Sequence, residues 1–301
     1  MEEKFKSGFV SIIGRTNVGK STLINSLTGE KVAITANKSQ TTRTAIRAII
    51  NRENSQIIFI DPPGIHKPKT KLGETMLETA YGAVTDVDVV LFMVDASRNE
   101  IPKGDKIILE KIKEAHKPTI LIINKIDLIK RENLLKVIDM YRNEYDFKAV
   151  IPTSAIKSKE VNAILNEIEE LLKPGPAYYD IDEYTDQTER QLVEETIREK
   201  ALKLLDEEVP HGIYVETEKM QERTTSKGEQ IYDVEATIYC LRNSHKGIII
   251  GKGGQMLKRI GTYARQDLER MLGIKINLKI WVKVKEDWQE KESIVNKFKM
   301  K

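Results

Sequence analysis

Residues 14–21, Gly-Arg-Thr-Asn-Val-Gly-Lys-Ser, fit the pattern G-x-x-x-x-G-K-[ST]. An apolar, β-branched run precedes them at residues 9–13, and residues 20–28 have the pattern of a helix. A glycine-rich turn between a buried strand and a helix directs backbone N–H groups at phosphates, at the positive end of the helix. This one feature predicts an α/β fold with a phosphate-binding loop.

Three shorter motifs follow along the chain: Asp-Pro-Pro-Gly at 61–64, Asn-Lys-Ile-Asp at 124–127 and Thr-Ser-Ala at 153–155. The first comes directly after the apolar run 57–60, and the second after the apolar run 119–123. Each motif is therefore expected at the carboxyl end of a strand, where open α/β sheets bind their ligands. Their order predicts that the first senses a terminal phosphate and that the other two read a guanine base.

Up to about residue 172, predicted strands and helices alternate, which indicates a mostly parallel sheet with helices on both faces. A hairpin at 44–61 is expected to add one antiparallel edge. We predict a GTP-binding domain over 1–173 and a polar linker over 174–188. Helices are predicted at 20–28, 72–84, 103–115, 132–144 and 158–172, and strands at 9–13, 44–50, 56–61, 87–95, 119–123 and 148–152.

A second, α+β domain is predicted over 189–301. Its elements are expected in the order helix, strand, strand, short helix, helix, strand, with a polar loop at 223–230 between the first two strands. The helices are predicted at 189–208, 246–250, 255–272 and 288–298, and the strands at 213–218, 231–241 and 274–284.

Composition limits the class of protein. A chain of 301 residues suits two domains. Its single cysteine, Cys240, excludes a disulfide framework and suits the reducing cytoplasm. Residues 245–301 hold 14 Lys/Arg against 6 Asp/Glu, a net charge of +8. This asymmetry predicts a polyanionic partner, either nucleic acid or a membrane surface, and an ordinary solvated surface is the alternative.

The phosphate end of the site follows from residue chemistry. Lys20 is expected to bridge the β- and γ-phosphates, and Ser21 to give its hydroxyl to Mg²⁺. Asp61 should reach the same metal, directly or through water. Gly64 has no side chain, so its N–H can meet the γ-phosphate. We choose Thr42, in the polar segment 38–43, for the second hydroxyl on Mg²⁺.

Thr41, next to Thr42, remains the alternative metal ligand. At the base, Asp127 can accept hydrogen bonds from guanine N1–H and the exocyclic amine, whereas adenine would leave that carboxylate unpaired. Asn124 fits the acceptor edge of the base, Lys125 covers its face, and the backbone N–H of Ala155 suits O6.

These motifs resemble those of the translation-factor-like (TRAFAC) GTPases, and the whole chain is similar to the Era family of bacterial GTPases, which carry a C-terminal KH domain. The resemblance implies a P-loop GTPase domain, binding of GTP and GDP with Mg²⁺, and hydrolysis of GTP. It also implies binding to the 3′ end of small-subunit (16S) rRNA, and a role in maturation of the 30S subunit. The predicted GTP-binding residues are Gly14, Arg15, Thr16, Asn17, Val18, Gly19, Lys20, Ser21, Thr22, Asp61, Pro62, Pro63, Gly64, Ile65, Asn124, Lys125, Ile126, Asp127, Ser154 and Ala155.

One position departs from small signalling GTPases, which have a water-orienting glutamine directly after Asp-x-x-Gly. Here the residue is Ile65, so we expect slow hydrolysis; the next residue, His66, is a weak candidate for the missing role. In potassium-activated relatives an asparagine in the phosphate loop helps to bind K⁺, which makes Asn17 a candidate for K⁺-stimulated activity. The predicted catalytic residues are Lys20, Thr42, Gly64 and Asn17.

In the second domain, Gly-Lys-Gly-Gly at 251–254 lies between a short apolar helix and a basic one. This context is typical of the GxxG loop of a type II KH domain, which clamps single-stranded RNA. Ile249 and Ile250 are candidates for an apolar floor beneath the bases. The predicted RNA-binding residues are Ile249, Ile250, Gly251, Lys252, Gly253, Gly254, Lys258 and Arg259.

We therefore expect a cytoplasmic, monomeric GTP switch in which the nucleotide controls RNA binding. Two alternatives remain. The basic domain can instead dock on anionic lipid at the cytoplasmic side of the membrane, in a regulatory GTPase. Or GTP sets the conformation with negligible hydrolysis, in a pure binding module.

Overall fold

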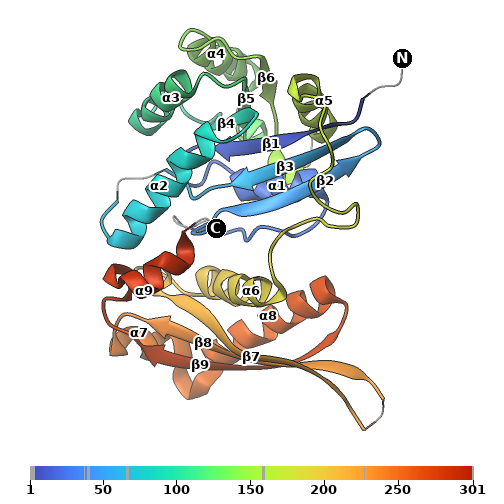
Figure 1. Ribbon diagram of the computed structural model, residues 1–301. Coiled ribbons are helices and arrows are strands. Elements are labelled where there is room, and N and C mark those ends of the chain that lie inside the picture. The colour runs from blue at the N-terminus through green and yellow to red at the C-terminus, as the bar shows by residue number, and fades with distance from the viewer. Residues whose placement is uncertain are drawn as a thin grey trace. The chain divides into compact units, whose positions relative to one another are not determined.

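The structure is a computed structural model that describes residues 4–36, 38, 41–65, 68–157, 160–226 and 228–299. The chain divides into two compact units, which we treat separately (Figure 1). The first unit comprises residues 1–33, 42–186 and 296–301. The second comprises residues 187–295 together with the short segment 34–41, although this segment lies early in the sequence. His66 lies outside the described residues.

The first unit contains a six-stranded sheet with the strand order β2-β3-β1-β4-β5-β6. The pairings from β3 to β6 are parallel, whereas β2 pairs antiparallel with β3 at one edge, as the early hairpin predicts. The α/β prediction is therefore confirmed. The strands are β1 (Lys6–Ile13), β2 (Ile46–Arg52), β3 (Ser55–Asp61), β4 (Val89–Asp95), β5 (Thr119–Asn124) and β6 (Ala149–Pro152).

Helices cover both faces of this sheet. Helices α1 and α5 share one hydrophobic core with its first face, and α2, α3 and α4 share a second core with the other face. Strands β3, β4 and β5 are buried over their whole length, which explains their unbroken apolar runs. The helices are α1 (Lys20–Thr28), α2 (Lys71–Thr85), α3 (Lys103–Ala115), α4 (Arg131–Arg142) and α5 (Val161–Leu171), with short 3₁₀ turns η1 (Ile126–Leu128) and η2 (Ala155–Lys157).

Residues 174–186, predicted to be part of a linker, lie along the β2–β3 edge of the sheet. The backbone N–H of Ile49 donates to the carbonyl oxygen of Tyr184 at 3.0 Å. The Gln56 side chain accepts from the backbone N–H of Tyr178 at 2.6 Å. A polar, proline-rich composition does not reveal such contacts, because they depend on which strand edge is left unpaired.

The second unit has a three-stranded sheet in which β8 pairs antiparallel with β7 and parallel with β9. Apolar residues of α6, α7 and α8 pack with one face of the sheet. The order helix, strand, strand, helix, loop, helix, strand matches a type II KH domain, as predicted. The elements are α6 (Glu189–Leu204), η3 (Val209–Gly212), β7 (Tyr214–Thr224), β8 (Gln230–Cys240), α7 (Asn243–Ile250), η4 (Lys252–Gly254), α8 (Gln255–Leu272) and β9 (Lys275–Val284).

Two elements differ from the prediction. The β7–β8 hairpin is longer, because backbone pairing continues as far as Thr224 opposite Gln230 through residues that are polar enough to resemble a loop. The single helix predicted for 288–298 was wrong. This stretch is broken into η5 (Trp288–Glu290), α9 (Glu292–Val295) and η6 (Asn296–Phe298).

Trp288 accounts for the irregular end of the chain. Its side chain is fully buried, and its indole N–H donates to the carbonyl oxygen of Gly212 at 3.0 Å. The ring also packs on Tyr214, with 4.6 Å between centroids. Lys291 then takes an extended conformation (φ −79°, ψ 112°), which interrupts the helix. Within the described residues, no helix is both long and apolar enough to cross a membrane.

Candidate functional site

The phosphate loop runs from the end of β1 into α1, and the described contacts explain its glycines. Gly19 has φ 110°, and a Cβ there would lie 2.3 Å from Nδ2 of Asn124. The Lys20 side chain is buried, and its Nζ donates to the carbonyl oxygens of Gly14 at 3.3 Å and Arg15 at 3.4 Å. The ammonium group thus lies across the loop, where a lysine that reaches phosphates belongs.

The three predicted metal ligands lie together. Ser21 Oγ donates to Asp61 Oδ2 at 2.7 Å, and Thr42 Oγ1 lies 3.0 Å from Ser21 Oγ and 3.5 Å from Asp61 Oδ2. The Thr41 hydroxyl instead donates to the carbonyl oxygen of Lys38 at 2.6 Å. The geometry therefore brings Thr42, and not the alternative Thr41, to the other two residues.

The donor set suits Mg²⁺. Oδ1 of Asp61 is buried and has no hydrogen-bond partner, beside two hydroxyl oxygens. Burial raises the pKa of the Asp61 carboxyl, with Lys20 and the Ser21 and Thr42 hydroxyls opposing that shift, and burial lowers the pKa of the Lys20 amine, with Asp61 opposing. Each buried charge thus needs more countercharge than the chain supplies. A hard cation at Asp61 and phosphates at Lys20 would provide it.

The Asp-x-x-Gly segment reaches back to the phosphate loop. A Cβ on Gly64 would lie 2.9 Å from Thr16 Cγ2 and 3.2 Å from Lys20 Nζ, so only glycine allows this approach. The next residue, Ile65, forms an isolated parallel bridge with Arg15. The side chain of Ile65 is apolar and buried, so it cannot orient a water molecule.

The remaining residues of these two motifs divide into packed and exposed ones. Asn17 is exposed and has φ 63°, a left-handed conformation that asparagine tolerates better than most residues. Its side chain is therefore available to solvent, as a potassium ligand requires, although the backbone alone also explains an asparagine here. Val18, Pro62 and Pro63 are buried, and Thr22 is half-buried at the start of α1.

At the base-reading end, serine and aspartate side chains orient the predicted recognition residues. Ser154 Oγ donates to Asp127 Oδ1 at 2.6 Å, and this hydrogen bond lowers the pKa of the Asp127 carboxyl. Lys125 Nζ donates to Asp95 Oδ2 at 2.7 Å. Sequence reasoning missed Asp95; the signal was present, because it ends the buried strand β4 as Asp61 ends β3.

Asn124 also has a structural role that its motif does not reveal. Its side chain is buried, Nδ2 donates to the carbonyl oxygen of Val18 at 2.8 Å, and Oδ1 accepts from the backbone N–H of Ala155 at 3.0 Å. Asn124 therefore ties the phosphate loop to the Thr-Ser-Ala segment, and the second N–H of its amide stays the predicted donor to the acceptor edge of a base. The Ala155 N–H, predicted for guanine O6, is engaged by this tie. Ile126 lies in η1, between Lys125 and Asp127.

In the second unit, the Gly-Lys-Gly-Gly loop joins α7 to α8. Gly251, Gly253 and Gly254 have φ angles of 71°, 57° and 76°, a region that disfavours any other residue. The loop exposes Lys252 and leads into the N-terminus of α8. A backbone of this kind can approach a phosphodiester chain closely, with positive charge beside it.

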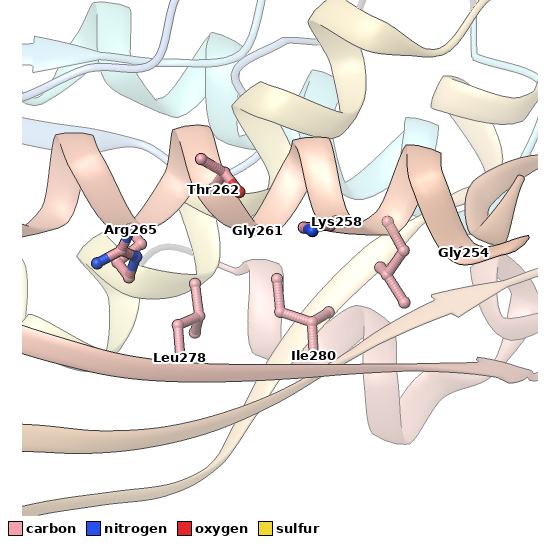
Figure 2. A pocket seen from close by; sticks show the side chains of 8 residues that line it. Gly254, Lys258, Gly261, Thr262, Arg265, Leu278 and Ile280 are labelled. Carbon is pink, nitrogen blue, oxygen red and sulfur yellow. The ribbon is translucent and has the colours of Figure 1, made fainter.

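A groove of about 380 Å³ begins at this loop and runs between α8 and β9 (Figure 2). In Figure 2, Lys258 and Arg265 project from the helix, and Leu278 and Ile280 rise from the strand toward it. Gly261 keeps the middle open, because a Cβ there would lie 3.5 Å from Ile280 Cδ1. The groove is lined by Gly254, Leu257, Lys258, Gly261, Thr262, Arg265, Leu278 and Ile280.

The apolar surface of the groove is not formed by the two isoleucines that the sequence predicted beneath the bases. Ile249 is fully buried in the core of this unit, so no base can reach it, and the prediction for this residue was wrong. Ile250 is partly buried against the same core, and Arg259 is exposed on α8 but does not line the groove. Sequence reasoning missed Leu278 and Ile280, whose alternation along β9 was the available signal.

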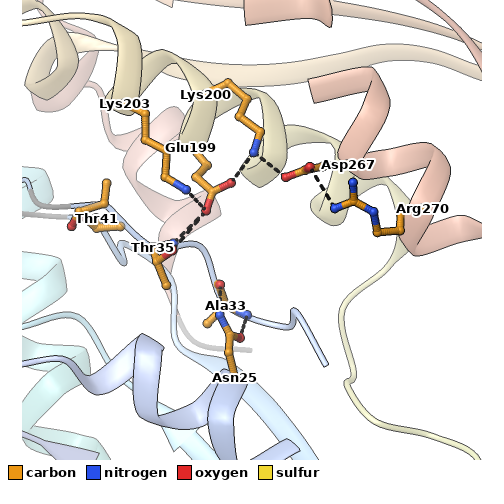
Figure 3. A network of polar contacts seen from close by, with 10 residues as sticks. Asn25, Ala33, Thr35, Thr41, Glu199, Lys200, Lys203, Asp267 and Arg270 are labelled. Atoms are coloured by element: carbon orange, nitrogen blue, oxygen red, sulfur yellow. Dashed lines mark hydrogen bonds and ion pairs between the residues drawn. The ribbon is translucent and has the colours of Figure 1, made fainter. Parts of the chain in front are cut away.

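Helix α6 holds the segment 34–41, which precedes Thr42 (Figure 3). Glu199 is fully buried, and its Oε1 accepts from the backbone N–H of Thr35 at 3.0 Å. Arg198, also buried, donates from Nη2 to the carbonyl oxygen of Thr41. Both ends of the segment are thereby fixed to one turn of α6.

The same network extends to α8. Lys200 Nζ donates to Glu199 Oε2 at 3.0 Å and also to Asp267 of α8. Burial lowers the pKa of the Lys200 amine, but its hydrogen bonds and charge interactions with Asp267 and Glu199 outweigh this and hold the pKa above its usual value. Lys203 Nζ donates to Glu199 Oε1 at 3.0 Å. A continuous chain of polar contacts, centred on the buried Glu199, thus links segment 34–41 to the helix that lines the groove.

Comparison with known proteins identifies the domain family of each unit. The family model for 50S ribosome-binding GTPases matches residues 9–125, and the KH domain model matches residues 208–289. The GTPase Era of Clostridioides difficile (strain 630) is 51% identical over 295 residues, 98% of each chain. The GTPase Era of Caldanaerobacter subterraneus subsp. tengcongensis is 50% identical over 293 residues, 97% of each chain.

Solved structures agree with these relatives. A variant of Aquifex aeolicus Era bound to GDP·AlF4⁻ has a TM-score of 0.92 and 38% identity, covering 98% of this chain and 99% of that one. Era in complex with MgGDPNP and nucleotides 1506–1542 of 16S ribosomal RNA has a TM-score of 0.93 and 39% identity, covering 98% of both chains.

The fold and the phosphate and base motifs define a P-loop GTPase joined to a type II KH domain. The chain belongs to the Era family of GTPases, and hydrolysis of GTP to GDP and phosphate is its reaction.

Proposed function

We propose that this protein is a GTP-controlled RNA-binding switch that binds single-stranded RNA at the 3′ end of 16S rRNA and acts in maturation of the 30S subunit in the cytoplasm. The observation that carries the proposal is the grouping of segment 34–41 with the KH unit. This segment leads into Thr42, the proposed second hydroxyl ligand of Mg²⁺, and is held by α6, the helix that also contacts α8. The relative crystallised with nucleotides of 16S rRNA supports the identity of the RNA.

The GTPase chemistry is assigned to residues as follows. Lys20 would neutralise the β- and γ-phosphates, and the N–H of Gly64 would meet the γ-phosphate. Ser21, Thr42 and Asp61 would hold Mg²⁺, which supplies positive charge against the charge that develops during phosphoryl transfer. Ile65 leaves the attacking water without a side-chain partner at that position. We therefore propose slow intrinsic turnover, with Asn17 as a K⁺ ligand that raises it.

The potassium proposal has a direct test. GTP turnover is measured in KCl and in NaCl at equal ionic strength, for the wild type and for Asn17→Ala. We expect faster turnover in KCl for the wild type and similar rates in the two salts for the variant. Equal wild-type rates would contradict the role of K⁺.

The RNA contact is assigned to the groove between α8 and β9. Lys258 and Arg265 in the groove, and Lys252 in the glycine loop at its end, supply charge for phosphates, while Leu278 and Ile280 offer apolar surface on which bases can lie. The glycine loop at one end of the groove allows close approach of the RNA backbone. A groove with one basic and one apolar side suits single-stranded RNA better than a flat lipid surface.

The test measures binding of short single-stranded RNAs from the 16S rRNA 3′ end with GDPNP, with GDP and without nucleotide. We expect tighter binding with GDPNP, lost when Gly253→Asp and Gly254→Asp are combined. Equal RNA affinity in all three states would refute the control by nucleotide.

The same glycine variant separates RNA binding from the membrane alternative. Vesicles containing anionic lipid are offered to the wild type and to the double variant under the same conditions. Binding to vesicles that depends on the two glycines, with no binding to RNA, would favour the membrane alternative over our proposal.

A further inference from the structure

We infer that Asp105 of α3 is a positioning residue for GTP hydrolysis: it anchors Arg15, and through Arg15 it sets the part of the phosphate loop on which the Asp-Pro-Pro-Gly segment docks. Arg15 Nε donates to Asp105 Oδ1 at 2.9 Å. The carboxylate is fully buried, and its other oxygen, Oδ2, accepts from Tyr141 of α4 at 2.8 Å. The Arg15 side chain thus reaches from the phosphate loop to a polar site made by α3 and α4.

The site around Asp105 has the space that the Arg15 side chain needs. Gly104 lies beside Asp105 in the first turn of α3, and a Cβ there would lie 2.6 Å from Arg15 Cδ. Glycine is unfavourable within a helix, so its presence here is explained by the need to admit the arginine. Tyr141 is also buried, so its hydroxyl has Asp105 as its specific partner. Asp105 therefore holds Arg15, Tyr141 holds Asp105, and Gly104 leaves the space that the arginine occupies.

The phosphate loop consequently has two separate anchors. Asn124 holds its second half through the carbonyl oxygen of Val18 at 2.8 Å. Asp105 holds its first half through Arg15. These halves differ in what they support, because the second half begins α1, whereas the first half faces the Asp-x-x-Gly segment.

The first half of the loop is the part that contacts the Asp-Pro-Pro-Gly segment and Ile65, which follows it. Arg15 pairs with Ile65 in a parallel bridge, and Thr16 sets the close approach of Gly64. In GTPases this segment is ordered by the γ-phosphate and released after hydrolysis. A loosened Arg15 should therefore weaken binding of GTP analogues and slow hydrolysis, while contacts that GDP makes with the second half of the loop persist.

The experiment compares Asp105→Asn and Gly104→Ala with the wild type. Affinities for GDPNP and GDP are measured by titration, and kcat and KM for GTP by phosphate release. We expect the GDPNP affinity to fall at least about tenfold more than the GDP affinity, and kcat to fall roughly tenfold to hundredfold, since small misplacements at a reacting centre have effects of that size. Arg15→Ala combined with Asp105→Asn should add little to either single change.

Asp139→Asn, an exposed aspartate on α4, is the matched control and should leave all four quantities unchanged. Gly104→Ala displaces the arginine without altering the buried carboxylate, so it decides the question if Asp105→Asn fails to fold. GDPNP and GDP affinities that fall by the same factor in Gly104→Ala would show a merely structural role and overturn the inference, as would no change at all. No RNA is present, so the outcome is independent of the proposed RNA binding.

Discussion

At the residue scale, several side chains of the nucleotide site serve the protein's own geometry as much as a ligand. Asn124 ties two loops together, and Arg15 anchors the phosphate loop to α3. Ser154 orients the carboxylate of Asp127 at 2.6 Å. A motif predicts that such residues lie at the site, but not which of their atoms are already engaged. The distinction between Thr41 and Thr42 is of the same kind and leads to a prediction.

Replacing Thr42 should affect the metal, whereas replacing Thr41 should not. Thr42→Ala removes an oxygen from the cluster around Asp61, so the Mg²⁺ concentration for half-maximal GTP hydrolysis should rise at least about tenfold. Thr41→Ala removes a hydroxyl that bonds to the carbonyl of Lys38 and is the matched control. A larger Mg²⁺ effect in Thr41→Ala would reverse the assignment of the metal ligand.

The buried carboxylate of Asp105 should leave a signature in the pH dependence of stability. Burial raises its pKa above the ordinary value of 3.8, with the hydrogen bonds from Tyr141 and Arg15 opposing. A raised carboxyl pKa means that the folded state binds the proton more tightly than the unfolded state. This contribution to stability is present below about pH 3.8 and is lost as pH rises through the folded pKa.

The measurement is the free energy of unfolding of the wild type minus that of Asp105→Asn, at several pH values from about 3.5 to 7. The difference should fall with rising pH and then level, because the asparagine does not titrate. A difference that rises with pH would mean that the folded pKa is depressed instead.

At the element scale, α8 both packs into the core of the second unit and lines its groove. One side packs into the core through Ile260, Ala264 and Leu268, and another side carries Lys258 and Arg265 along the groove. The opposite face of the sheet also exposes lysines, among them Lys279 on β9. Lys279 and Lys283 of that face pair with Glu235 and Glu218, whereas the described residues that line the groove include no acidic one, so the contributions of the two faces to RNA binding can be separated by experiment.

Phosphate contacts are revealed by the salt dependence of binding. Lys258→Ala and Arg265→Ala should each weaken RNA binding and reduce the slope of log affinity against log salt by about 0.7, the value for one single-strand phosphate contact. Lys279→Ala, on the face of the sheet opposite the groove, should leave the slope unchanged. A larger slope change for Lys279→Ala than for the two groove variants would place the RNA on the face of the sheet opposite the groove.

At the scale of the whole molecule, the main division of the chain, after residue 186, lies where its two sequence patterns meet, but one earlier segment departs from it. Segment 34–41 lies between α1 and β2 in the sequence but groups with residues 187–295. Glu199 and Arg198 of α6 hold its two ends. Thr42, the proposed metal ligand, follows this segment directly in the sequence. This arrangement gives the coupling a specific test.

Glu199→Gln should reduce the control of RNA binding by nucleotide. The variant keeps an oxygen that can accept from Thr35 but removes the charge that Lys200 and Lys203 neutralise. We expect the ratio of RNA affinities with GDPNP and GDP to fall by about three- to tenfold toward 1, a coupling loss in the usual range for linked sites. The matched control is Glu189→Gln, an exposed position on the same helix that bonds to Tyr232 and to neither Thr35 nor Arg198. An unchanged ratio in Glu199→Gln would exclude this helix as the coupling element.

The sequence alone determined the fold class, the order of nearly all the elements and the strand ends at which the phosphate and base motifs lie. Motifs that follow apolar strands must lie at the carboxyl edge of the sheet, and positive φ angles at the Gly-Lys-Gly-Gly loop require glycine. Tertiary structure decided which atoms are engaged. The tie from Asn124 to Val18, the burial of Ile249, the groove between α8 and β9 and the hold of α6 on segment 34–41 all join residues far apart in the chain. Local pattern cannot contain such contacts, because packing brings these residues together only once the whole chain has folded.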